Sequence, residues 1–152
     1  MRARELPWGK LVGAGALLAI VLGVMIVVRG GQHVPDSVQP IEWNHQPCAQ
    51  CQMLIGDPRY AAQLITQDGQ VLSFDDPGCA LRYVDTHHDV AIHRLWFHHS
   101  TDDRWLTADE VAFTTGATTP MGSGLAAVDR KPSGALDLAA ATRVATREGT
   151  AR

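Results

Sequence analysis

The feature that most constrains this chain is an uncharged apolar run near its N-terminus, at residues 11–28. As an α-helix, a run of this length spans about 27 Å, which matches the hydrocarbon thickness of a bilayer. Arg2, Arg4 and Lys10 precede the run, and Arg29 follows it directly. Because positive charge accumulates on the cytoplasmic side of membrane helices, the run is predicted to be a single-pass transmembrane anchor with its N-terminus inside.

Two other readings of residues 11–28 are weighed against this one. A cleaved signal peptide would have a shorter apolar core and a small-residue cleavage site, and neither is evident. A buried core helix is disfavoured by the length of the run and by its basic flank. We therefore expect residues 1–10 to be cytoplasmic. The protein should reside in the inner (cytoplasmic) membrane, with a soluble domain in the periplasm or outside, which are oxidising surroundings.

The remainder of the chain is long enough for one modest domain. Residues 29–42 are mostly polar and contain Pro35 and Pro40, which predicts a linker. Residues 43–146 should form the soluble domain, and residues 147–152 a frayed tail.

Sequence patterns in the domain predict an α+β class, a small two-part domain of short antiparallel strands and helices in ββα-like units. Strands are expected at residues 60–66 and 71–74, around an Asp-Gly hairpin turn. Asp75 or Asp76 should then cap a helix with Pro77 in its first turn. The second half repeats this plan loosely, with a strand at 91–99, a short helical turn at 107–112, a strand at 126–128 and a helix at 136–144.

The chemistry concentrates in the motif H-x2-C-x2-C-x-M, formed by His45, Cys48, Cys51 and Met53. Two cysteines with two intervening residues can place both sulfurs on one metal ion, because a tight turn brings them together. A thioether is a poor ligand for zinc and a good one for copper(I). Met53 therefore favours copper(I) as the metal.

Other uses of these cysteines stay open on the residues alone. Cys48 and Cys51 could act as a thiol–disulfide oxidoreductase, or they could join Cys79 and a histidine in a structural zinc site. Cys79, near the start of the predicted helix, is either a further ligand with its thiolate stabilised by the helix dipole or a small buried apolar residue.

Several functions are disfavoured by the rest of the sequence. The formal net charge of −3 offers no basic excess for phosphates, so nucleic-acid binding is not expected. No nucleotide-binding or hydrolase motif occurs, and nothing indicates an enzyme. Most of the histidines in the pairs His87–His88 and His98–His99, with His93 between them, are expected to be solvated or at strand edges. Because neighbours in a strand point to opposite faces, one pair cannot easily share a metal ion.

Three sequence blocks, taken together, resemble the NosL family. They are C-x2-C-x-M at 48–53, FDDPGCALRY at 74–83 and TPMGSGLAAV at 119–128. The resemblance implies a copper(I)-binding accessory protein of nitrous oxide reductase maturation, with a small α+β fold similar to that of the organomercurial lyase group. By position, Cys51 and Met53 match the family's Cys-x-Met core and Cys48 the cysteine before it. Met121 falls in the Pro-Met-Gly block and becomes a second thioether candidate.

The sequence thus leads to one hypothesis. The chain is a membrane-anchored metallochaperone, not an enzyme, that passes copper(I) to an apo-metalloenzyme client, either nitrous oxide reductase or another copper enzyme. One departure from the family is Gln52, where glycine is common. The candidate metal ligands are Cys51, Met53, Cys48, Met121, Cys79 and His45.

Overall fold

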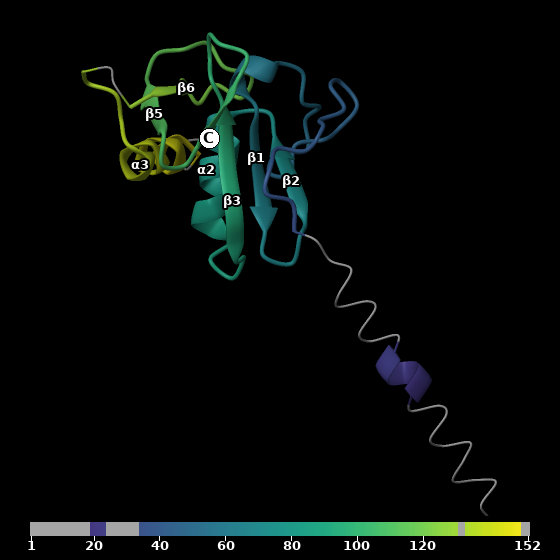
Figure 1. Cartoon of the computed structure of the whole chain (residues 1–152). Helices are drawn as coiled ribbons and strands as arrows, with labels where there is room; N and C mark the ends of the chain where they lie inside the picture. The colour runs from purple at the N-terminus through teal and green to yellow at the C-terminus, as the bar shows by residue number, and fades with distance from the viewer. Residues whose placement is uncertain (1–18, 24–33, 131–132, 150–152) are drawn as a thin grey trace, which may run out of the picture. The chain divides into compact units, whose positions relative to one another are not determined.

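The computed structural model describes residues 19–23, 34–130 and 133–149 (Figure 1). The chain divides into two units, Met1–His33 and Val34–Arg152. Residues 19–23 are helical, but the rest of the predicted anchor and the predicted cytoplasmic N-terminus lie outside the described residues. Within the described ranges, no helix is both long enough and apolar enough to span a bilayer.

The second unit is built on a four-stranded antiparallel sheet with strand order β2-β1-β3-β4. Its strands are β1 (Ala62–Thr66), β2 (Val71–Phe74), β3 (Ile92–His98) and β4 (Trp105–Thr107). Helix α2 follows β2 directly and packs on one face of the sheet, and α3 lies beside α2 (Figure 1). The remaining elements are the 3-10 turn η1 (Pro58–Tyr60), α2 (Pro77–Thr86), the paired strands β5 (Val111–Thr114) and β6 (Ala126–Asp129), and α3 (Leu138–Gly149). The predicted small α+β domain of antiparallel strands is therefore confirmed.

The core lies between the sheet and α2, and it continues to α3 and the β5-β6 pair. Leu64 of β1 pairs in register with Leu72 and Leu95 on the strands at either side, and no part of its side chain is exposed. Phe97 and Phe113 meet edge to face with their ring centroids 5.0 Å apart, which joins the large sheet to the β5-β6 pair. Such aromatic contacts add about 0.5–1.5 kcal/mol beyond the area that they bury.

The structure confirms the turn and helix start that the sequence predicts in the first half of the domain. It contradicts one prediction for the second half. The β1-β2 hairpin turns at Gly69, whose φ of +87° is a conformation that suits glycine. The helical turn expected at 107–112 is wrong. Glu110 does accept hydrogen bonds from the backbone and hydroxyl of Thr107, at 3.0 and 2.8 Å, but these contacts close a turn between β4 and β5.

Asp76 fixes the start of α2 and attaches a distant loop to it. Its fully buried carboxylate accepts from the backbone N–H of Gly78 at 2.7 Å, which is the helix cap, and from that of Met121 at 3.0 Å. A Cβ on Gly78 would lie only 2.4 Å from Cβ of Ser123, so only glycine permits this close approach. The Pro-Met-Gly block is thereby held against the N-terminus of α2.

Residues 34–42, most of the predicted linker, contain no helix or strand but are bonded to the sheet. The Gln39 backbone donates to the buried side chain of Gln63 in β1 at 2.7 Å, and Gln63 donates back to the Gln39 carbonyl at 3.1 Å. Asp36 pairs with His93 at 2.8 Å and with Arg94 at 3.1 Å on β3. This part of the chain belongs to the second unit.

Candidate metal centre

A hairpin-like loop presents the two cysteines of the C-x2-C motif. Pro47 and Leu54 form an isolated antiparallel bridge, and the Cys48 N–H donates to the Met53 carbonyl at 2.8 Å. The Ala49 N–H donates to the carbonyl of a β2 residue at 2.9 Å, which ties the loop to the sheet. Cys48 and Cys51 are thus held in one tight turn beside the end of β2.

Helix α2 contributes the third cysteine to the same place. Cys79 is the third residue of α2, and the sulfurs of Cys48, Cys51 and Cys79 all lie within 4.8 Å of one another. All three are free thiols. Three sulfurs about 2.3 Å from one ion in a trigonal plane would lie about 4 Å apart, so the cluster needs little contraction to hold a soft metal ion.

The three thiols differ in their surroundings. The thiol of Cys79 hydrogen-bonds Cys48 and, against the effect of burial, lowers the pKa of Cys48 to about 5. Backbone N–H groups of Cys51, Asp75 and Gln50 add to this lowering. The same contact with Cys48, together with burial, raises the pKa of Cys79, and burial raises the pKa of Cys51. At neutral pH the cluster therefore holds one thiolate and two thiols.

Arg82 is a residue of the site that sequence reasoning missed. Its Nη2 donates to the Cys79 sulfur at 3.4 Å, while its Nη1 donates to the carbonyl of Ala145 in α3 at 3.3 Å. A guanidinium at this place offsets negative charge on the sulfur ligands. The signal was present in the sequence, because residues three apart on a helix share a face.

The other candidate ligands are placed less centrally. Met53 lies in the same loop, and its side chain is 58% exposed. The side chain of Met121 is half-buried against the core. Its backbone N–H donates to Asp76, the cap of α2, which holds it beside the N-terminus of that helix. His45 is exposed and is not part of the thiol cluster. Among the described residues, the three cysteines are the group of His, Cys, Asp or Glu side chains whose ligand atoms lie close enough together to share a metal ion.

Gln52 occupies an unusual backbone conformation between Cys51 and Met53. Its φ is +64°, in the left-handed region that residues other than glycine seldom adopt. Its side-chain Nε2 donates a hydrogen bond to the Cys48 carbonyl at 3.3 Å. The loop therefore keeps the geometry that glycine would favour and tolerates glutamine in its place.

We expect Gln52→Gly to raise the free energy of unfolding by about 0.5–1 kcal/mol, because glycine relieves the left-handed strain. Urea unfolding followed by circular dichroism would measure this. Gln52→Ala is the control: it keeps the strain, loses the side-chain hydrogen bond and should be less stable than the wild type. An equal loss in both variants would contradict the strain argument.

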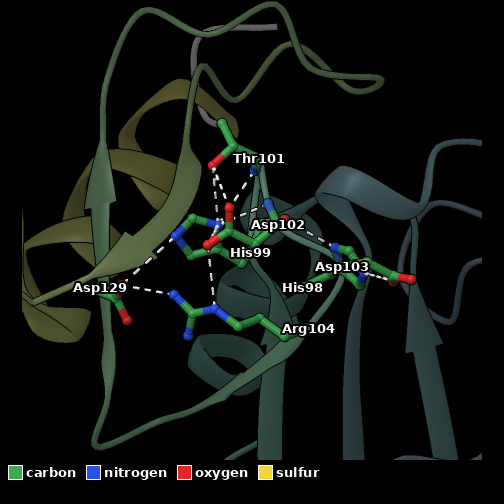
Figure 2. Close-up of polar contacts among 7 residues, drawn as sticks. All are labelled: His98, His99, Thr101, Asp102, Asp103, Arg104 and Asp129. Atoms are coloured by element: carbon green, nitrogen blue, oxygen red, sulfur yellow. Dashed lines mark hydrogen bonds and ion pairs between the residues drawn. The ribbon is translucent and has the colours of Figure 1, made fainter.

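The expectation of solvated or edge histidines is wrong for His98 and His99, which are each 6% exposed. His98 is the last residue of the inner strand β3, and His99 follows it directly. Nδ1 of His99 accepts from the backbone N–H groups of Thr101 and Asp102, at 3.3 and 3.1 Å. His98 contacts the carbonyl of His99 at 2.9 Å through Nδ1 and Asp103 at 3.3 Å through Nε2. Figure 2 shows these contacts with Arg104 and Asp129, which form an ion pair at 2.7 Å. Both histidines therefore hold the turn between β3 and β4 through hydrogen bonds.

One solved structure resembles the chain in its fold. It is the crystal structure of the copper chaperone NosL from Shewanella denitrificans, with a TM-score of 0.50 and 17% sequence identity over 75% of this chain and 88% of that one. The chain therefore has a NosL-like fold. No protein-family model matches the chain, and no curated protein does so either. The NosL-like fold carries a three-cysteine cluster suited to a metal ion.

Proposed function

We propose that this chain is a membrane-anchored, extracytoplasmic copper(I) metallochaperone that supplies a copper enzyme during its assembly, with nitrous oxide reductase as the favoured client. The observation that carries the proposal is the convergence of Cys48, Cys51 and Cys79 within 4.8 Å. The NosL-like fold supports it, and the apolar run at residues 11–28 supports the anchor.

The donor set favours copper(I) over a structural zinc site. Structural zinc is bound by four ligands in a closed tetrahedron, whereas the part of the chain that the structure describes gathers three thiols and no fourth His, Asp or Glu. Copper(I) accepts two or three soft sulfur donors, and the loop offers the thioether of Met53 beside them. A site with few ligands also suits a metal that must leave again.

The position of the C-x2-C motif argues against disulfide exchange as the main activity. Cys48 lies in a loop before the first strand and is fully buried, so a substrate disulfide has no access to its sulfur. Cys51 is partly exposed, which gives a client protein one sulfur from which copper(I) can pass by ligand exchange.

Copper(I) titration of the reduced full chain against a chromogenic chelator tests the proposal. We expect one tightly held ion, and Cys51→Ser should weaken its affinity about 100-fold, because one of three thiolate ligands is lost. His45→Ala is the matched control, since His45 is exposed in the same loop and outside the thiol cluster; it should bind like the wild type. A wild type that holds copper(I) no better than Cys51→Ser would refute the proposal.

A further inference from the structure

The sulfur-bearing side chains of the site form a gradient from solvent to core. Met53 is 58% exposed, Cys51 is half-buried, and neither Cys48 nor Cys79 has any exposed surface. An ion that arrives from solvent, or from another protein, therefore meets the loop of Cys51 and Met53 before it can reach the inner pair.

The inner pair is built to hold a metal–thiolate complex. Cys48 receives hydrogen bonds from backbone N–H groups, and Cys79 receives one from the guanidinium of Arg82 at 3.4 Å. Arg82 is itself fixed by its bond to the Ala145 carbonyl, so its charge stays beside the sulfur. Three thiolates and copper(I) carry a net charge of −2, and buried negative charge needs such a partner.

We propose that Met53 captures copper(I) at the surface and that Cys48 and Cys79, supported by Arg82, retain it beneath. This rests on the proposed function and adds an order of events to it. Copper(I) first binds the sulfurs of Met53 and Cys51. The bond to Met53 then breaks as bonds to Cys48 and Cys79 form, and the thiol protons pass to water. Release to a client runs the same steps in reverse.

The capture step predicts a kinetic effect of Met53 with little effect at equilibrium. In stopped-flow experiments on the full chain, Met53→Leu should slow copper(I) uptake from a chelator complex about tenfold. Its equilibrium affinity should stay within about threefold of the wild type, because the final thiolate ligands are unchanged. Leu54→Ala is the matched control: it removes the neighbouring side chain of the same loop, which is 54% exposed and carries no sulfur, and should leave the uptake rate unaltered.

The retention step predicts the opposite pattern for Arg82. Arg82→Gln should raise the rate of copper(I) loss about tenfold without changing uptake, since outer partners of metal ligands typically contribute 10–100-fold to affinity. Arg82→Lys keeps the charge and should recover part of the loss. Cys79→Ser should raise the rate of loss further, and the Arg82 variants carry the test if that core substitution unfolds the protein.

Two results would overturn the proposal while leaving the proposed function standing. One is a Met53→Leu variant that takes up copper(I) at the wild-type rate, and the other is an Arg82→Gln variant that retains it as the wild type does. A wild type that binds no copper(I) would instead refute the proposed function itself.

Discussion

Between pH 8 and pH 6 the apparent copper(I) affinity of the full chain should fall about 10,000-fold. Metal ligation requires thiolates, and the pKa values of Cys51 and Cys79 are raised, so both sulfurs are protonated across this range. Each must release one proton when the ion binds. Because Cys48, with a pKa of about 5, is already ionised, the affinity should change about 100-fold for each pH unit, falling as the pH falls.

Chelator competition at several pH values, corrected for protonation of the chelator, gives this slope. Cys51→Ser supplies the internal control, because it removes one of the two protonated ligands and should reduce the slope to about tenfold per pH unit. A wild-type affinity that does not change with pH would contradict ligation by both Cys51 and Cys79.

Replacing Asp76 by alanine should lower the free energy of unfolding by about 3 kcal/mol. The loss of a helix cap costs about 1 kcal/mol, and a buried N–H left without an acceptor costs about 1–3 kcal/mol. Asp76 supplies both contacts, to Gly78 and to Met121. The loop that contains Met121 should also detach from α2, which native-state hydrogen exchange of its amides would detect.

Asp137→Ala is the matched control for this experiment. Asp137 accepts from the Ala140 N–H at 2.7 Å near the start of α3, and that contact is exposed and ties no second loop. Its loss should cost about 1 kcal/mol or less. If urea unfolding gave equal losses for Asp76→Ala and Asp137→Ala, the bond to Met121 would be of no consequence for stability.

Local sequence signals were enough for the first half of the domain. The Asp-Gly turn before β2 and the Asp-Asp-Pro sequence before α2 act over a few residues, so their outcome does not depend on the rest of the chain. The Thr107 and Glu110 pair shows where such signals end. The same two hydrogen bonds can open a helix or close a turn between strands, and the pairing of β4 with β3 decides between them.

The candidate metal centre could be predicted in part. The spacing of Cys48 and Cys51 indicated a shared turn, but Cys79 joins them only because α2 starts where the loop crosses the end of β2. The burial of His98 and His99 was likewise not evident from the sequence, because it follows from the place of β3 between β1 and β4 in the sheet. Arg82 was missed because its role follows from that of Cys79, three residues before it, and the sequence left open whether Cys79 is a ligand.

The bonds between residues 34–42 and the sheet decide where this protein can be cut for laboratory work. A shortened version that begins at Trp43 would lack Gln39, and the fully buried Gln63 amide would keep only its 3.1 Å contact with Ser73. It would also lack the carboxylate that faces His93 and Arg94. A recombinant soluble form should therefore start no later than Val34. Residues 34–42 have the composition of a linker, but the sheet needs the hydrogen bonds and ion pairs that they make to it.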